Sequence, residues 1–417
     1  MRETVWQLVA RLCPDGVPYR KLGEVCEFPT ERISMSNAKC YVGVENLVKD
    51  RGGANVSYDF PKADTAIAFK SGDVLIGNIR PYLRKIWLAD SEGGTNGDVI
   101  LIRVASESLN ARYLYYNLSS ESFFYFLNNG ARGGKMPRGD KKTVPTYPIP
   151  IPPPEVQREV VRILDKFSAK TATLVSLLGE ELAARRKQYA YYRDCLLSFD
   201  GGTRGGSGGA RLPPAIALMV ARACPDGVEY RMLGEIGRVC MCKRIMKAET
   251  SSEGDVPFYK IGTFGGTADA YISRETFEKY KAAYPYPKKG DILISAAGTI
   301  GKTVIFDGEP AYFQDSNIVW VDNDESLVLN KYLFYCYQQQ PWAVSKGGTI
   351  ARIYNDNVSN AKIPLPPLEV QREVARILDE FSALTTSLTT GLPAEIAARQ
   401  KQYEYWRDKL LAFKRKG

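Results

Sequence analysis

The residues best suited to chemistry in this chain are cations that gather in one short segment. Residues 131–145 read "ARGGKMPRGDKKTVP" and set five basic side chains against one acid, Asp140: Arg132, Lys135, Arg138, Lys141 and Lys142. The glycines and prolines predict a loop, from which long cationic side chains can reach phosphate oxygens and base edges. For any single residue, a solvated charged surface is an equally good interpretation.

Two further segments carry the same kind of residues. "SKGGTIARIYNDNV" (345–358) has Lys346 and Arg352 around two glycines, at the corresponding place in the second half of the chain. "IRPYLRK" (79–85) adds Arg80, Tyr82, Arg84 and Lys85. The recurrence of the glycine-containing basic loop in both halves favours DNA binding by the loop as a whole. Charge and location add three more candidate DNA contacts: Lys260, Thr299 and Lys302.

The overall charge agrees with this interpretation but does not establish it. The 417 residues include 56 lysines and arginines and 47 acids, a net charge of +9, and the pI is about 8.9. Mild positive charge suits a polyanionic partner, although many basic proteins bind nothing acidic.

The sequence contains no recognisable catalytic constellation. There is no histidine, which excludes Ser/His and Cys/His nucleophile systems and HExxH metal sites. No acid or amide precedes the prolines of "IPPPE" or "PLPPL", as amino-group methyl transfer would need, and no Glu-x-Lys nuclease tail occurs. The eight cysteines form no regular framework, so we expect reduced thiols, and Cys240 with Cys242 lacks the further ligands that zinc requires. We therefore expect neither a catalytic site nor a metal site in this chain.

The segment "GTIGKT" (298–303) superficially resembles a phosphate-binding P-loop. A true P-loop needs a glycine five positions before the Gly-Lys step, and Ala296 stands there. A turn between two strands is the better interpretation, with Lys302 still able to face an external phosphate.

At the level of the whole chain, the sequence is an internal duplication. "CPDGVPYRKLGEV" from Cys13 returns as "CPDGVEYRMLGEI" from Cys224, and "RKQYAYYRDCLLSF" ending at Phe199 returns as "QKQYEYWRDKLLAF" ending at Phe413. Of the 20 residues at 150–169, 16 are identical to those at 364–383. Because other parts of the repeat share little, each half has a constant part and a variable part.

The constant part predicts a long helix. Pro154 can occupy the first helical position, and hydrophobic residues then follow helical spacing for about 45 residues, or roughly 70 Å. Such a helix needs a partner to bury its apolar stripe, and the second copy supplies one. The candidates for helix pairing or partner docking are Val156, Val160, Ile163, Phe167, Val370, Val374, Ile377 and Phe381. We expect the second helix to kink or restart near Pro393.

The variable parts predict mixed α/β domains. Short strands are expected at 73–79, 85–89 and 98–104, with counterparts in the second half, and helices after Asn110 and Asn330. We divide the chain into a first domain (1–149), a first long helix (150–199), a glycine-rich linker (200–214), a second domain (215–363) and a second long helix (364–417). No signal peptide and no membrane-spanning apolar run is recognisable, so we expect a cytoplasmic protein.

These motifs, in this order and doubled, resemble the specificity subunits of type I restriction-modification systems. The resemblance covers nearly the whole chain, and "IPIPPPEVQREVVRILDKF" (149–167) is its most specific part. It implies two α/β target-recognition domains in tandem, separated by two long antiparallel coiled-coil helices with pseudo-two-fold symmetry. Each domain would read one half of a bipartite, asymmetric DNA site.

The resemblance also implies partners and places the cofactors on them. The helices would dock two adenine-N6 methyltransferase (modification) subunits that carry S-adenosylmethionine, and restriction subunits that use ATP and Mg²⁺ would join them. The alternative is a non-catalytic coiled-coil adaptor whose domains bind protein or RNA. A self-sufficient enzyme is the third and least favoured class.

Overall fold

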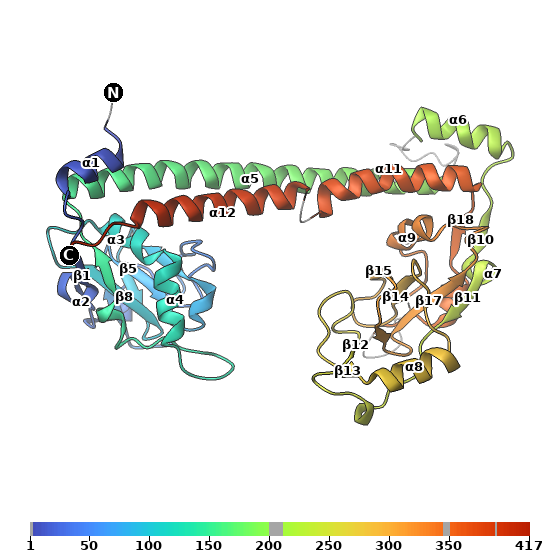
Figure 1. The fold of residues 1–417 in the computed structure, drawn as a ribbon, viewed down its shortest axis with the longest axis horizontal. Coiled ribbons are helices and arrows are strands. Elements are labelled where there is room, and N and C mark those ends of the chain that lie inside the picture. Colours follow the sequence, from blue (N-terminus) through green and yellow to red (C-terminus); the bar gives the residue numbers. More distant parts are fainter. Residues whose placement is uncertain (1–2, 200–211, 345–350, 388–389) are drawn as a thin grey trace. The chain divides into compact units, whose positions relative to one another are not determined.

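The computed structural model describes residues 3–199, 212–344, 351–387 and 390–417. The chain divides into two units: Met1–Gly179 with Glu395–Gly417, and Glu180–Ala394. Each unit therefore combines one α/β domain with parts of two long helices (Figure 1). The Gly-rich segment expected as a linker lies almost wholly outside the described residues.

The domain of the first unit is built on antiparallel strands. A four-stranded sheet has the order β2 (Cys26–Glu27), β8 (Val99–Val104), β5 (Val74–Gly77), β6 (Ile86–Leu88). A second sheet joins β3 (Arg32–Ser34), β4 (Thr65–Phe69) and β7 (Gly93–Thr95), and β1 (Tyr19–Lys21) pairs with β9 (Pro148–Pro150). The helices are α1 (Val5–Leu12), α2 (Leu22–Val25), α3 (Ala111–Leu118) and α4 (Glu121–Asn129), with 3-10 turns at Met35–Asn37, Pro81–Leu83 and Val144–Thr146.

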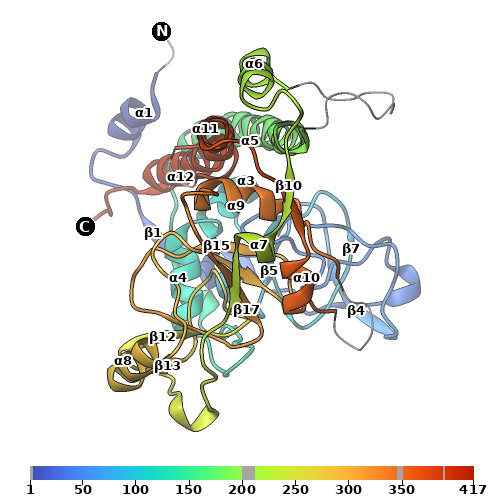
Figure 2. The ribbon, with the colours of Figure 1, turned by 90° about the vertical axis from the view of Figure 1, so that its right-hand side faces the viewer.

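The domain of the second unit repeats this plan. Its four-stranded sheet has the order β11 (Gly237–Cys240), β17 (Ile318–Asn323), β14 (Ile292–Ser295), β15 (Thr303–Ile305), and β10 (Tyr230–Met232) pairs with β18 (Lys362–Pro364). Its three-stranded sheet joins β13 (Tyr271–Ile272), β12 (Val256–Tyr259) and β16 (Tyr312–Phe313), and differs from that of the first domain because β12 and β16 are parallel. The helices are α6 (Pro214–Ala223), α7 (Leu233–Ile236), α8 (Arg274–Ala283), α9 (Asn330–Gln338) and α10 (Asn355–Ser359), with a 3-10 turn at Lys247–Glu249. Figure 2 shows α10 packed against α7.

The duplicated α/β fold predicted from the sequence is confirmed, including the three strands expected in each half. The central strands consist of buried apolar residues: Val74, Leu75 and Ile76 of β5 and Ile292, Leu293 and Ile294 of β14 are all at most 3% exposed. These strands are buried because helices or a second layer cover them on both faces, which explains why their sequences show continuous rather than alternating hydrophobicity.

The long helices are α5 (Pro154–Ser198), α11 (Leu368–Thr386) and α12 (Leu392–Leu411). In the first unit α5 packs against α12, with the rings of Phe167 and Tyr403 5.7 Å apart. In the second unit α5 packs against α11, where the rings of Tyr192 and Phe381 are 5.4 Å apart. Within the first unit, Val160 shares a core with Leu410, and Phe167 further along α5 meets Tyr403, which precedes Leu410, so α5 and α12 are antiparallel. Within the second unit, Leu196 shares a core with Val374, and Tyr192 before it meets Phe381 after Val374, so α5 and α11 are antiparallel.

The second copy of the long helix is divided in two around a glycine and a proline. A Cβ on Gly391 would lie 2.7 Å from the carbonyl oxygen of Ala383 and 2.8 Å from that of Leu384, so the turn after α11 has no room for a side chain. Pro393 occupies the second position of α12, where its missing N–H costs nothing. The same proline inside a continuous helix would remove a hydrogen bond and clash with the preceding turn.

A buried glutamine joins each domain to its long helix. Gln157 donates from Nε2 to the carbonyl oxygens of Ser108 (2.7 Å) and Pro152 (2.8 Å), and its Oε1 accepts from the backbone N–H of Asn110 (2.9 Å). These bonds connect the first turn of α5, the proline segment before it and the chain that enters α3. The buried amide thus has hydrogen-bond partners for both N–H groups and for its oxygen, as burial away from water requires.

Gln371 repeats this arrangement in the second unit. It donates to the carbonyl oxygens of Leu327 (3.0 Å) and Pro366 (2.8 Å) and accepts from the N–H of Leu329 (2.9 Å). A tyrosine accompanies each glutamine: the hydroxyl of Tyr113 donates to the carbonyl of Pro150, and that of Tyr332 to the carbonyl of Pro364. The near identity of "EVQREV" in the two halves therefore reflects a junction that both domains need.

Each domain core also includes the ends of two different long helices. In the first unit Val156, Val160 and Leu164 of α5 share a core with Leu410, Leu411 and Phe413 from the end of the chain. In the second unit Val370, Val374 and Leu378 of α11 share a core with Leu196, Leu197 and Phe199. The predicted apolar stripe thus packs into the domains as well as between helices, and Val156, Val160, Val370 and Val374 are fully buried there.

We predict that Gln157→Ala destabilises the first unit and leaves the second unchanged. The substitution leaves the buried carbonyl of Pro152, the part-buried carbonyl of Ser108 and the part-buried N–H of Asn110 without their partner, so the free energy of unfolding should fall by about 1–3 kcal/mol. Hydrogen-exchange mass spectrometry in increasing urea reports the two domains separately and measures this. The control Arg158→Ala changes the next, exposed position of α5 and should cost under about 0.5 kcal/mol; equal effects of the two variants would contradict the role assigned to Gln157.

Candidate nucleic-acid interface

The basic loop of the first unit connects α4 to the 3-10 turn at Val144–Thr146 (Figure 1). Its base is closed by two backbone hydrogen bonds between Arg132 and Arg138, of 2.9 and 2.8 Å. Arg138 also forms a β-bridge with Ile79, and the N–H of Arg80 donates to the carbonyl of Pro137 at 2.7 Å. The fold therefore brings together the two basic segments of this half, 79–85 and 132–142, that the sequence analysis singled out.

The basic side chains of this loop differ in their exposure to solvent and in whether they already have a partner. Arg132, Lys135 and Lys142 are exposed, and their side chains have no hydrogen bond or ion pair among the described residues. Arg138 is 61% exposed and forms an ion pair with Asp98 at 3.2 Å. Lys141 donates from Nζ to the carbonyls of Gly97 and Val99, and burial lowers the pKa of its ammonium group. Lys141 thus anchors the loop to the sheet, whereas the first three can reach a polyanion.

In the neighbouring turn at residues 79–85, basic side chains bind to acids and a carbonyl group of nearby segments and so fix the turn in place. Arg84 forms ion pairs with Glu121 (3.2 Å) and Asp50 (3.7 Å). Lys85 donates from Nζ to the carbonyl of Val44 at 2.6 Å, and burial lowers its pKa. Arg80 and Arg84 both adopt left-handed backbone conformations, with φ of 53° and 49°, which a non-glycine residue adopts only when its surroundings hold it there.

Tyr82 lies between these two constrained arginines and is 51% exposed. Of the four candidates in this turn, it is the one whose side chain both projects to solvent and has no partner among the described residues. An exposed tyrosine in a turn that is bridged to a basic loop can stack on a base or donate to a phosphate.

The second unit brings its corresponding segments together in the same way. Arg352 forms a β-bridge with Ala297, just as Arg138 does with Ile79. Its guanidinium group donates to Oδ1 of Asn317 at 2.5 Å. Gly298 stands at the position of Arg80 and has a similar φ, 65° against 53°. The backbone geometry is therefore common to both halves, while the side chains on it differ.

The other candidates of the second unit are mostly engaged within it. Lys260 forms an ion pair with Asp269 at 2.8 Å. Lys302 donates from Nζ to the carbonyl of Phe264 at 2.5 Å, and the carbonyl of Thr299 accepts from the hydroxyl of Ser295. Residues 298–302 thus form the turn between β14 and β15. Lys346 lies outside the described residues.

A basic and aromatic surface around α8 was not among the DNA-binding segments predicted from the sequence. It includes Lys281, whose Nζ lies 5.2 Å from the ring centre of Tyr286, and Lys243, 5.0 Å from that of Tyr284. Lys281, with Lys288 and Lys289, borders an open cavity of about 560 Å³. The signal was present in the segment "KYKAAYPYPKK" (279–289), where lysine and tyrosine alternate, but the first half of the chain has no counterpart to it.

The described residues do not offer a metal site. No group of three or more His, Cys, Asp or Glu side chains within them is placed to hold a metal ion. Cys242 is buried, and burial raises the pKa of its thiol to about 12, which disfavours the thiolate that zinc would bind. No helix in the described ranges is long and apolar enough to cross a membrane.

Comparison with known proteins identifies a family. The type I restriction modification DNA specificity domain matches twice, at residues 14–182 and 225–398. A Haemophilus influenzae protein assigned as the type I restriction enzyme specificity subunit S.HindORF215P is 50% identical over 311 residues, which are 74% of this chain and 73% of that protein. The Escherichia coli type I restriction enzyme EcoR124I/EcoR124II specificity subunit is 32% identical over 64% of this chain and 63% of its own length.

A solved structure shares the fold. A chain described in work on complex assembly and conformational transition of the type I restriction-modification system superposes with a TM-score of 0.60 at 23% identity, covering 95% of this chain and 97% of that one. At this identity the likeness concerns the fold alone. It agrees with the repeated domains and packed long helices described above.

The two matched domains, the duplicated junctions and the 50% identical relative lead to one conclusion. The chain belongs to the DNA specificity subunits of type I restriction-modification enzymes, the non-catalytic subunits of those enzymes.

Proposed function

We propose that each domain reads one half of a bipartite DNA site and that the long helices dock two modification subunits. The observation that carries this proposal is the contrast within the repeat. The junctions at Gln157 and Gln371 make the same hydrogen bonds, whereas the basic loops differ in sequence, with five basic residues in 131–145 and two in 345–358. A repeated scaffold suits two copies of one partner, and two different loop surfaces suit two different half-sites.

In the first domain the proposed DNA-contacting surface is the loop 132–142 together with Tyr82. Arg132, Lys135 and Lys142 have no competing acidic partner among the described residues, so they can form ion pairs with phosphates. Phosphate contacts supply most of the affinity and its salt dependence. Arg138 is largely exposed and lies beside the turn that carries Tyr82, where its weak pairing with Asp98 can be exchanged for a contact with DNA.

In the second domain the positions that correspond to Arg80 and Arg138 are Gly298 and Arg352. Around α8, Lys243, Lys281 and Lys289 are exposed cations without an acidic partner among the described residues, whereas Lys288 pairs with Asp322. Because Lys260, Lys302 and Arg352 already have partners, we assign them to holding the loops in position. The two domains therefore differ in which elements present positive charge, as recognition of two unlike sequences would require.

We predict that Arg132→Ala, Lys135→Ala and Lys142→Ala together weaken DNA binding at all sequences. The slope of log affinity against log salt concentration should fall by about 1 to 3, roughly one unit for each ion pair with a phosphate that the substitutions remove. Titrations of labelled duplex DNA at several salt concentrations, with the modification subunit present, measure this slope. The matched control removes three exposed cations from the same unit, Arg20, Lys21 and Lys170, and an equal fall in slope there would place the loop away from DNA.

For partner docking, the exposed aromatic residues of the long helices are better candidates than the buried valines. Tyr405 on α12 is 59% exposed and Tyr191 on α5 is 52% exposed. They occupy equivalent positions in "KQYEYWRD" (401–408) and "KQYAYYRD" (187–194). Each packs against the next residue of its helix, Trp406 or Tyr192, with ring centres 5.4 Å apart. Tyr405 and Tyr191 thus provide one equivalent exposed aromatic position for each of two identical partners, since aromatic residues dominate the centres of interfaces.

We predict that Tyr405→Asp lowers the number of modification subunits bound per chain from two to one, and that Tyr405→Asp with Tyr191→Asp lowers it to zero. A buried carboxylate in place of a central tyrosine should cost at least about 2 kcal/mol of binding free energy per site. Native mass spectrometry of the purified complex counts the subunits. Tyr58→Asp, at a position 76% exposed in the first domain, is the control and should leave two bound; full occupancy in the double variant would refute this docking surface.

The chemistry of the complex is then carried by the partners. We propose that S-adenosylmethionine binds the modification subunits, that ATP and Mg²⁺ bind the restriction subunits, and that the complex acts on DNA in the cytoplasm. The present chain contributes the choice of DNA sequence and the geometry in which the modification subunits meet it.

A further inference from the structure

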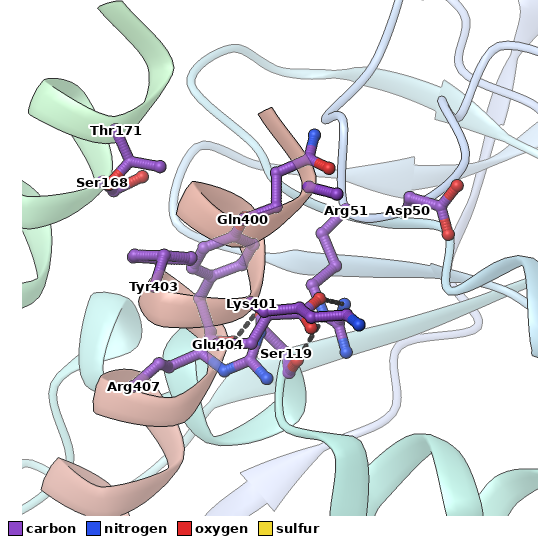
Figure 3. Close-up of a pocket in the computed structure, with 12 residues that line it drawn as sticks. Asp50, Arg51, Ser119, Ser168, Thr171, Gln400, Lys401, Tyr403, Glu404 and Arg407 are labelled. Carbon is purple, nitrogen blue, oxygen red and sulfur yellow. Dashed lines mark hydrogen bonds and ion pairs between the residues drawn. The ribbon is translucent and has the colours of Figure 1, made fainter. Parts of the chain in front are cut away.

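A polar cavity in the first unit has no role in the function proposed above. It has a volume of about 420 Å³ and lies between α5, α12, the end of α3 and the loop at Asp50. Figure 3 shows Ser168 and Thr171 on α5 at one side, Arg51 at the other, and Gln400, Lys401, Tyr403, Glu404 and Arg407 projecting from α12.

Arg407 on the wall of this cavity is buried without full pairing. Its side chain is 0% exposed, and its Nε donates to Oδ1 of Asp408 at 2.8 Å. The two terminal guanidinium nitrogens are buried and have no hydrogen-bond partner among the described residues. A buried cation with two unused donor groups is costly, because burial has removed the water that would otherwise solvate them.

The other charges of the cavity do not compensate Arg407. Arg51 donates to Glu404 at 2.9 Å, to Glu121 at 2.6 Å and to the carbonyl of Ser119 at 2.6 Å. Lys401 is exposed at the cavity and forms no ion pair or hydrogen bond with any described residue. Two carboxylates line the cavity, and both pair with other cations: Glu404 with Arg51, and Asp50 with Arg84 at 3.7 Å. Asp408 contacts only the Nε edge of Arg407.

The second unit fills the corresponding position with a larger side chain. Gln338 stands at the place of Ser119, and its Oε1 accepts from the hydroxyl of Tyr189, the counterpart of Tyr403, at 2.7 Å. Arg193, the counterpart of Arg407, places both Nε and a terminal nitrogen on Asp194 and is 19% exposed. The small side chain of Ser119 and the unpaired nitrogens of Arg407 are therefore specific to the first unit.

We propose that this cavity binds a small tetrahedral oxyanion such as inorganic phosphate, held between the guanidinium group of Arg407 and the ammonium group of Lys401. A planar guanidinium with two free N–H groups fits the paired oxygens of such an anion. The hydroxyl groups of Tyr403 and Ser168 line the same space and supply further donors. Because the two terminal nitrogens of Arg407 are buried, an anion reaches them only when a lining side chain moves; Gln400 and Lys401 line the cavity, are exposed and have no partner among the described residues.

The test is a phosphate titration of the full chain followed by its thermal unfolding midpoint, at constant ionic strength with chloride as the balancing anion. Binding to the folded state predicts a saturable rise of the midpoint of the first unit. Ser119→Gln introduces the residue of the second unit and should abolish the rise by filling the cavity. Lys401→Gln leaves the buried groups in place and should raise the half-saturating phosphate concentration by about fivefold.

Lys187→Gln is the matched control, because Lys187 is the exposed counterpart of Lys401 in the second unit. It should leave the titration unchanged. A non-saturable rise, or a rise of the same size in Ser119→Gln as in the unmodified chain, would overturn the proposal, as would equal weakening by Lys401→Gln and Lys187→Gln.

Discussion

Neither domain of this chain has a complete core without the end of a helix from the other half of the sequence. Leu410, Leu411 and Phe413 are 7–8% exposed and pack in the core of the first domain. The core of the second domain includes Leu196, Leu197 and Phe199, which are at most 9% exposed. Each such side chain contributes about 1.5–3 kcal/mol of burial free energy. The duplication therefore contributes to folding, since each half of the sequence stabilises the domain of the other half.

Because each domain core includes a helix end from the other half of the sequence, some residues cannot vary freely. The residues that enter a domain core from the helices, together with Gln157, Gln371 and the prolines before them, must keep their geometry in both halves. The loops beyond the four-stranded sheets are free of this constraint. Arg138 and Arg352 occupy equivalent bridges to Ile79 and Ala297, yet the sequences around them differ, with five basic residues in 131–145 and two in 345–358. A constant junction with variable loops allows recognition to change while the scaffold is retained.

Much of the fold could be predicted from the sequence because its signals are local. Pro154 starts α5, the strands at 73–79 and 98–104 are continuous apolar runs, and the repeat identifies two domains. The part of the protein against which the valines pack could not be predicted. Helical spacing shows that Val160 and Val374 are buried, but not that a domain core covers them. Gln157 and Gln371 also carry no local signal of burial, since their partners lie 42 to 49 residues away or in the preceding proline segment.

The candidate site was predictable as a region and less so residue by residue. The sequence identified the loop 132–142 and the turn 79–85, and the structure brings them together. It could not show that Lys85 and Lys141 are bound to the carbonyls of Val44 and Gly97, because those acceptors lie 41 and 44 residues away. The DNA contacts themselves stay predictions.

The central claim is that the two domains read DNA independently on a shared scaffold. Its most direct test exchanges residues 20–149 for the corresponding domain of another family member and sequences the methylome with a cognate modification subunit present. We expect one half of the methylated bipartite sequence to change and the other half to be retained; a change in both halves, or the absence of any bipartite sequence with a folded chain, would contradict the claim.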